Sequence, residues 1–255
     1  MSKNINNVCL VPSNLLLPEI IYKYREVNDR LLSSLEKNEI WFAELQSFND
    51  PFEPARIFSG TPYGNTLKND IDESGILCLC KNNLNLPMWS YYGNGLRGIA
   101  IGYNTEEFLR TLEPVKPHKN EHNPRWRYVF DMKYDDSELG QIQEMNLLLN
   151  NEMTDLERQK MFATKSNAYS HEDEFRIVIQ PKPIFIDEDP SPLWISGIGL
   201  YKHSQDSIRE IIFGELCSKL DRQRIKQILA NRKINYKEVV RSKNSFTIQL
   251  RDDLE

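Results

Sequence analysis

Two glutamates and an arginine stand at alternate positions late in the chain, as Glu172, Glu174 and Arg176. They enter the segment EFRIVIQ, whose alternation is typical of a strand with one buried face, so their side chains are predicted to share one side. Two carboxylates about 7 Å apart can act as a general base or stabilise a developing cation, and the arginine can keep one ionised. The alternative is a ladder of surface ion pairs, which are common and individually weak.

A pair of cations lies near the N-terminus in the segment YKYR. Strand alternation predicts Lys23 and Arg25 on one face and Tyr22 and Tyr24 on the other. Two neighbouring cations favour an anionic partner, and we count the adjoining Tyr24 with them as a binding residue. A solvated strand edge is the alternative, since lysine is common at exposed sheet edges.

The segment MWSYYG concentrates aromatic side chains, with Ser90 between Trp89 and the pair Tyr91 and Tyr92. Such rings can stack on a planar ligand, and they can equally bury large areas in a core. Both interpretations stay open at this point.

The loop FNDPFE carries polar residues between Phe48 and Phe52, and its Asn-Asp-Pro sequence favours a turn. We expect the two phenylalanines to pin the loop to the core, so that its polar side chains form one wall of a cleft. A buried Asp50 is then expected to pair with Arg25 or Arg176. The alternative is that Asp50 only closes the turn through its own backbone.

Common nucleotide and metal motifs are absent or out of context. The letters of Gly93–Gly98 match GxGxxG, but the segment precedes a predicted strand and does not open a helix. His118 and His122 lie in a segment rich in proline and asparagine, with no regular element to hold metal ligands. We therefore expect no metal site.

Composition predicts one folded domain. The 255 residues are 40% hydrophobic and 27% charged with a net charge of -5, which excludes a disordered chain and a uniformly basic surface. Residues 1–19 are interpreted as an N-terminal extension and 20–255 as a single α+β domain. A poor signal peptide and four cysteines without a CxxC pair indicate reduced thiols and a cytoplasmic location without a membrane partner.

The hydrophobic pattern supplies the elements that must position these groups. It predicts strands at Ile20–Tyr24, Gly75–Cys80 and Glu174–Gln180, and a long helix from about Asp136 to Lys165. The C-terminal part is predicted to be a strand, a helix and two strands, at Glu210–Phe213, Leu216–Ala230, Tyr236–Val240 and Phe246–Leu250.

From about Ile20 to Leu250 the chain resembles a bacterial and phage-borne family, domain-of-unknown-function family 2971. The resemblance rests on an ordered set of blocks: YKYR, LxSLEKNEIWFAELQSFNDPFE, ILCLCKNN, PMWSYYGNGLRGIAIGY, the Tyr169-xx-Glu172-x-Glu174-x-Arg176 motif and REIIFG. This chain has Tyr169 where tryptophan is usual and Cys80 where a serine is expected. This resemblance identifies related proteins, but it does not imply which reaction they catalyse.

A weaker resemblance, in the order of a basic first strand, a middle motif and a late Glu-x-Glu, is to ADP-ribosyltransferases that cleave NAD. It implies an ADP-ribosyltransferase-like split sheet, two small and roughly perpendicular sheets forming a cleft, with flanking helices and the C-terminal strand-helix-strand extension. It also implies that Glu174 stabilises the oxocarbenium-like ribose and that Glu172 orients the accepting group.

The same resemblance implies binding residues for NAD as substrate. Arg25 would hold the pyrophosphate, and Trp89, Tyr91 or Tyr92 would stack on the nicotinamide. Ser90 is one candidate for the serine of the middle motif, and the strand around Cys80 is the other.

The expected function is accordingly an NAD-dependent ADP-ribosyltransferase without a metal, acting as an intracellular bacterial toxin or phage-defence effector. Its protein or nucleic-acid acceptor is unknown, and an antitoxin or immunity protein is an expected partner. One alternative is a non-catalytic nucleotide or nucleic-acid binding module that extends the YKYR cations with Arg56, Arg125, Trp126 and Arg127. A second is a metal-dependent nuclease built from Asp50, Glu53, Glu172 and Glu174.

Overall fold

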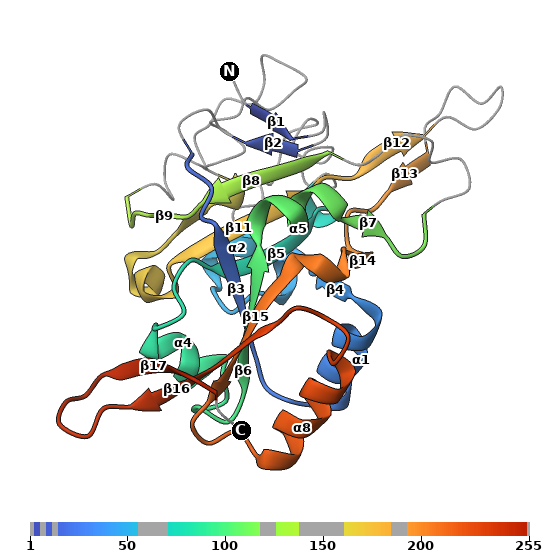
Figure 1. The fold of residues 1–255 in the computed structure, drawn as a ribbon. Helices are drawn as coiled ribbons and strands as arrows, with labels where there is room; N and C mark the ends of the chain where they lie inside the picture. The colour runs from blue at the N-terminus through green and yellow to red at the C-terminus, as the bar shows by residue number, and fades with distance from the viewer. Residues whose placement is uncertain are drawn as a thin grey trace.

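The computed structural model describes residues 3–5, 9–11, 15–55, 71–117, 126–137, 161–184 and 193–253. Within these ranges the protein has a mixed α+β fold, as the sequence predicts, in which one long sheet is accompanied by short helices (Figure 1). No helix in the described part of the chain is long and apolar enough to cross a membrane.

Ten of the described strands form one sheet with parallel and antiparallel neighbours. Their order across the sheet is β1 (Lys3–Ile5), β2 (Cys9–Val11), β8 (Arg127–Asp131), β11 (Glu174–Ile179), β5 (Gly75–Cys80), β3 (Ile20–Arg25), β6 (Ile99–Asn104), β15 (Ile208–Gly214), β16 (Asn235–Arg241) and β17 (Ile248–Asp252). The first two strands, which lie within residues 1–19, continue the sheet at the edge beside β8.

This sheet is nearly divided between β3 and β5. The two strands pair only at Tyr22 and Cys80, whereas β3 pairs with β6, and β5 with β11, over six positions each. In Figure 1 the strands β8, β11 and β5 run across the view, while β3, β6 and β15 run down it. The two halves of the sheet therefore diverge from this single pair.

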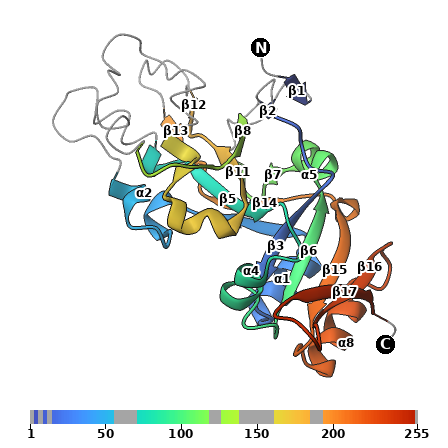
Figure 2. The same ribbon diagram turned by 90° about the vertical axis from the view of Figure 1, so that its left-hand side faces the viewer.

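Two helices cover part of the sheet. In α1 (Asp29–Lys37) the Asn28 side chain accepts a hydrogen bond from the Leu31 amide, and Asn38 ends the helix in the left-handed conformation. Helix α8 (Lys219–Ile228) follows β15 and lies beside α1 (Figures 1 and 2). Leu31 from α1 and Ile225 from α8 belong to the largest buried apolar cluster, which also takes side chains from both halves of the sheet.

The remaining elements are short. A three-stranded sheet consists of β4 (Glu39–Phe42), β14 (Gly199–Lys202) and β7 (Glu113–Pro114). Two-stranded sheets join β9 (Lys133–Tyr134) to β10 (Thr164–Lys165) and β12 (Lys182–Ile184) to β13 (Leu193–Ile195). The short helices are η1 (Leu45–Ser47), α2 (Phe52–Ala55), α4 (Leu86–Tyr91), α5 (Thr105–Thr111), η2 (Asn167–Glu172) and η3 (Gln205–Ser207).

The predicted strands and the C-terminal strand, helix and two strands are confirmed, with shifts of at most three residues at their ends. Most of the predicted helix from Asp136 to Lys165 lies outside the described residues. The helical prediction is wrong for its last two residues, because Thr164–Lys165 form strand β10, parallel to β9. That difference determines where the Lys165 side chain lies.

The segment Gly93–Gly98 turns the chain from α4 into β6 and opens no helix. Its last glycine is required by a close approach, since a Cβ atom on Gly98 would lie 2.2 Å from the carbonyl oxygen of Arg25. The GxGxxG letters thus serve the packing of this turn against the end of β3.

Candidate active site

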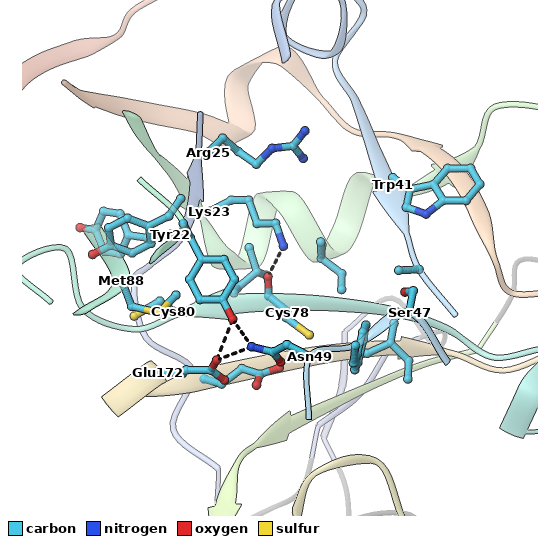
Figure 3. Close-up of a pocket in the computed structure, with 18 of the residues that line it drawn as sticks. Tyr22, Lys23, Arg25, Trp41, Ser47, Asn49, Cys78, Cys80, Met88 and Glu172 are labelled. Atoms are coloured by element: carbon cyan, nitrogen blue, oxygen red, sulfur yellow. Dashed lines mark hydrogen bonds between the residues drawn. The ribbon is translucent and has the colours of Figure 1, made fainter. Parts of the chain in front are cut away.

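A cavity of about 310 Å³ opens where β3 and β5 diverge. It takes its walls from both halves of the sheet, from the loop after η1 and from the ends of α4 and η2 (Figure 3). Its charged, polar and aromatic lining includes Lys23, Arg25, Trp41, Phe48, Asn49, Cys78, Tyr92, Lys165, Glu172 and Glu174. Most residues that the sequence marks as chemical candidates thus share one cavity.

Strand β3 forms the cationic wall. Lys23 and Arg25 lie on the face opposite the buried Tyr22 and Tyr24, as alternation predicts. The Lys23 Nζ donates a hydrogen bond of 2.7 Å to the Cys78 carbonyl, and burial lowers the pKa of this lysine. Within the described residues the Arg25 guanidinium forms no salt bridge, and Figure 3 shows it at the upper side of the cavity.

The opposite wall carries Glu172, the last residue of η2, which is 4% exposed. One carboxylate oxygen, Oε2, lies 2.6 Å from Lys165 Nζ. The other, Oε1, accepts a 2.8 Å hydrogen bond from the Tyr92 hydroxyl and a 3.4 Å contact from Asn49 Nδ2. Asp173, in the left-handed conformation, then turns the chain into β11. Glu172 therefore precedes the strand and is not part of the alternation that the sequence predicts.

Glu174 opens β11 and points to the same side as Arg176, as predicted. Its oxygens lie 2.6 Å from Arg176 Nε and 3.3 Å from Arg176 Nη2, and Oε2 is also 3.6 Å from Lys165 Nζ. Burial acts to raise the pKa of Glu174, but the charges of Arg176 and Lys165 outweigh it and hold the pKa at about 2. This carboxylate is ionised throughout the physiological range.

The cluster of charges is completed by Lys165, which the sequence did not mark as a site residue, and by Glu53, which it marked only in the nuclease alternative. Glu53 is fully buried, with Oε1 at 2.6 Å from Arg176 Nη1 and Oε2 at 3.7 Å from Lys165 Nζ. Lys165 is 3% exposed, and three carboxylates raise its pKa although burial acts to lower it. Three buried glutamates thus share two buried cations. We call these five residues the charge cluster: Glu53, Lys165, Glu172, Glu174 and Arg176.

The expected pairing of Asp50 with Arg25 or Arg176 is not formed. Asp50 is fully buried, yet its Oδ1 accepts a hydrogen bond of 2.9 Å from the Phe52 amide, which closes the turn. Glu53 takes the Arg176 guanidinium in its place. Asp50 is not among the residues that line the cavity. Only one of the two phenylalanines anchors the loop. The Arg176 guanidinium carbon lies 5.0 Å from the centre of the Phe48 ring, whereas Phe52 is 53% exposed.

Of the MWSYYG residues, only Tyr92 and Met88 line the cavity. Trp89 is fully buried, packs edge-on against Tyr24 at 5.1 Å and donates its indole N–H to a backbone carbonyl, so its core interpretation holds. Ser90 is exposed and donates to the Leu86 carbonyl. Tyr91 is 72% exposed and contacts His171. Trp89, Ser90 and Tyr91 therefore do not reach a ligand in this cavity.

The comparisons with known proteins give one match, over residues 88–177. These residues match the family described as Protein of unknown function (DUF2971). The match confirms the expected family resemblance for this segment, which holds the MWSYYG and Glu172-x-Glu174-x-Arg176 blocks. No curated protein and no solved structure matches the chain. The DUF2971 segment supplies the acidic wall of the cavity, while YKYR and FNDPFE lie outside the matched residues.

Outside the DUF2971 segment, Trp41 is a cavity residue that the sequence analysis missed. It belongs to β4, is 53% exposed and lies at the edge of the cavity in Figure 3. The segment IWF carries no feature that separates an exposed from a buried tryptophan. Tyr24 also lines the cavity, but its hydroxyl donates to the Asn82 carbonyl.

The binding-module alternative requires a basic patch that includes Arg127, but the Arg127 side chain does not contribute to such a surface. This arginine is 6% exposed and donates to the carbonyls of Leu109 and Leu112. Trp126 is 48% exposed, and Arg56 and Arg125 lie outside the described residues. Among the described side chains, no group of three or more His, Cys, Asp or Glu residues is arranged to hold a metal ion.

Proposed function

We propose that this protein binds NAD in the cavity between β3 and β5, cleaves its N-glycosidic bond and transfers the ADP-ribosyl group to an acceptor. The observation that carries the proposal is that one cavity brings the cations of β3, Lys23 and Arg25, to face the carboxylates Glu172 and Glu174. A dinucleotide carries an anionic pyrophosphate and, in the bond to be broken, a centre that becomes positive. The two walls have the charges that these two groups require.

The chemistry needs little beyond charge and position. As the bond between the ribose C1′ and the nicotinamide nitrogen breaks, its electron pair moves to the nitrogen and neutralises the pyridinium. Positive charge develops on the ribose, where an ionised carboxylate stabilises it. An acceptor oxygen or nitrogen then bonds to C1′ and releases a proton to solvent. Water as acceptor gives ADP-ribose, nicotinamide and a proton.

Binding is assigned to the opposite wall. Arg25 has a guanidinium with no ion pair among the described residues, and such a group can grip a phosphate with two hydrogen bonds. Of the three rings expected to stack on nicotinamide, Tyr92 alone lines the cavity. The sheet that diverges from the Tyr22 and Cys80 pair supports the split-sheet cleft that the proposal requires.

The test is nicotinamide release. Purified protein is incubated with NAD, alone and with cell lysate as a source of acceptors, and nicotinamide is quantified. We expect release by the wild type, a decrease of about 100-fold in Glu172→Gln, and no change in Glu36→Gln, an exposed glutamate on α1. No release by the wild type under either condition contradicts the proposal.

A second candidate is a nucleotide-binding module without chemistry. It is favoured by the pairing of both Glu174 oxygens with Arg176, which is also what a structural ion pair requires. Thermal melts with NAD, ADP-ribose and RNA separate the two, because a ligand that binds only the native state raises the melting temperature. Stabilisation by NAD without nicotinamide release, or by RNA alone, supports the binding module.

A further inference from the structure

We infer that Glu172, and not Glu174, is the carboxylate that contacts the ligand, and that Lys165 is the positioning residue that holds it. This inference rests on the proposed function and reverses the roles that the Glu-x-Glu resemblance implies. It follows from the difference between the partners of the two carboxylates.

Both oxygens of Glu174 are already paired with buried cations. Oε1 is held by Arg176 Nε at 2.6 Å, and Oε2 lies 3.3 Å from Arg176 Nη2 and 3.6 Å from Lys165 Nζ. Arg176 is itself fully buried and bound to Glu53 and the Phe162 carbonyl, so it cannot leave without exposing several buried polar groups. A ligand at this carboxylate would have to compete with charge-assisted contacts at both oxygens.

Glu172 differs at one oxygen. Its Oε2 is bound to Lys165 at 2.6 Å, but its Oε1 is held only by the neutral donors Tyr92 and Asn49, which also line the cavity. Asn49 donates to the Tyr92 hydroxyl at 2.7 Å, so the two form a short chain of donors in front of the carboxylate. Ligand hydroxyl groups can replace such neutral hydrogen bonds at little net cost. Glu172 is therefore the carboxylate prepared for a ligand with hydroxyl donors, such as a ribose.

Lys165 fixes the position of Glu172. Its Nζ lies 2.6 Å from Glu172, 3.6 Å from Glu174 and 3.7 Å from Glu53, and 4.6 Å from the centre of the Tyr169 ring. Its backbone is held in strand β10 beside β9. One ammonium group thus ties the ligand-facing carboxylate to the closed pair of Glu174 and Arg176. This arrangement orients Glu172 without using the oxygen that faces the cavity.

The experiment compares Glu172→Gln, Glu174→Gln, Lys165→Met and Lys165→Arg with the wild type. Three measurements are made: nicotinamide release with kcat and KM for NAD, binding of ADP-ribose by calorimetry, and melting temperature. We expect Glu172→Gln to lower kcat by about 100-fold and to weaken ADP-ribose binding, with a melting temperature close to that of the wild type. Glu174→Gln is expected to lower the melting temperature by several degrees, and its folded fraction to retain ADP-ribose binding.

Lys165 is tested by rescue. We expect Lys165→Met to lower kcat more than it raises KM, and Lys165→Arg to recover part of kcat because it restores the charge beside Glu172. A residue that only stabilised the fold would lower the apparent kcat through the folded fraction, and would leave KM and the kcat per folded molecule unchanged. Equal losses of kcat per folded molecule in the two variants therefore contradict the positioning role.

The two proposals fail in different ways. Turnover by the wild type, with kcat lost in Glu174→Gln at an unchanged melting temperature and kept in Glu172→Gln, overturns the inference and leaves the proposed function standing. No nicotinamide release, with ADP-ribose binding weakened only in Glu172→Gln, contradicts NAD cleavage and supports the inference. A wild type that binds neither NAD nor ADP-ribose overturns both.

Discussion

Lys165 Nζ and Glu172 Oε2 lie 2.6 Å apart, and the two side chains are 3% and 5% exposed. An ion pair this deeply buried contributes little net stability when it is intact, because both charges have lost their hydration. Removal of Lys165 is costly, because it leaves the Glu172 carboxylate without a cation, whereas removal of Glu172 leaves Lys165 beside Glu53 and Glu174. The charge cluster is therefore most informative when one member is changed at a time.

The first prediction concerns stability without the Lys165 charge. Lys165→Met leaves three buried glutamates facing Arg176 alone, so we expect the free energy of unfolding to fall by about 3–5 kcal/mol. Urea denaturation at neutral pH measures this change. Lys202→Met, at an exposed lysine of β14, is the matched control and should change stability by less than about 0.5 kcal/mol. Equal effects of the two substitutions would contradict the prediction.

Glu174 predicts a loss of stability in acid. Its pKa is about 2 in the folded protein against an ordinary 4.5, so the unfolded chain takes up this proton first. The stabilisation is complete at neutral pH and is lost as the pH falls from about 4.5 toward 2, to an extent of about 3 kcal/mol. Urea unfolding from pH 6 to pH 3 should show this slope in the wild type and in Glu36→Gln. An equal dependence of the unfolding free energy on pH in Glu174→Gln would show that other carboxyl groups cause it.

A second loss of stability, at higher pH than that of Glu174, is expected from the burial of His203. Burial between aromatic rings of β6 and α5 lowers the pKa of His203 from 6.5 to about 4, and its Nδ1 lies 2.9 Å from the Ser207 hydroxyl. The unfolded chain therefore binds this proton more readily, and stability decreases as the pH falls from 6.5 toward 4. We expect His203→Gln to be less stable at pH 7 and to lack this slope. An NMR titration that gives His203 a pKa near 6.5 in the folded protein would contradict the assignment.

Tyr92 and Tyr91 are adjacent, but only the first hydroxyl contacts the acidic wall. Tyr92→Phe removes the donor to Glu172 Oε1, and we expect a loss of about 1 kcal/mol in unfolding free energy together with a lower rate of nicotinamide release. Tyr91→Phe is the matched control, because that side chain is 72% exposed and does not line the cavity. Identical rates in the two variants would remove the Tyr92 hydroxyl from the site.

Substitutions of Asp50 distinguish a carboxylate that closes a turn from one whose charge is needed for an ion pair. Because its Oδ1 accepts from the Phe52 amide, Asp50→Asn keeps the acceptor, and we expect less than about 1 kcal/mol of destabilisation. Asp50→Ala removes the acceptor and should cost about 1–3 kcal/mol. Both are measured by thermal and urea unfolding. A loss in Asp50→Asn as large as that in Asp50→Ala would show that the charge itself matters.

Local patterns were sufficient to predict the strands that carry the site. The alternation in YKYR places Lys23 and Arg25 on the cavity face, and that in EFRIVIQ places Glu174 beside Arg176. In both segments the buried face is decided by neighbours in the sequence. Glu172 departs from its pattern because the left-handed Asp173 separates it from the strand.

The rest of the site depends on contacts between distant residues. Glu53 meets Arg176 across 123 positions of the chain, and no periodicity in FNDPFE distinguishes it from Asp50. Lys165 lies in a stretch whose leucines and methionines have helical spacing, yet Thr164 and Lys165 pair with β9. Trp89 and Tyr92 are three residues apart on one short helix and its end, but one is core and the other faces Glu172. Which partner a buried charge finds is decided by the fold as a whole.

The hydrogen bond from Lys23 Nζ to the Cys78 carbonyl links β3 to β5. On β5 it lies two residues from Cys80, which forms the single backbone pair with Tyr22 of β3. An incoming anion would approach the same ammonium group. An anion that draws Lys23 away leaves the carbonyl facing the cavity as a buried acceptor in need of a donor. A ligand that supplies both a negative group and an N–H or O–H donor loses less by entering than a simple anion does. Inorganic phosphate should consequently be a poor competitor for any occupant of this cavity that carries an amide.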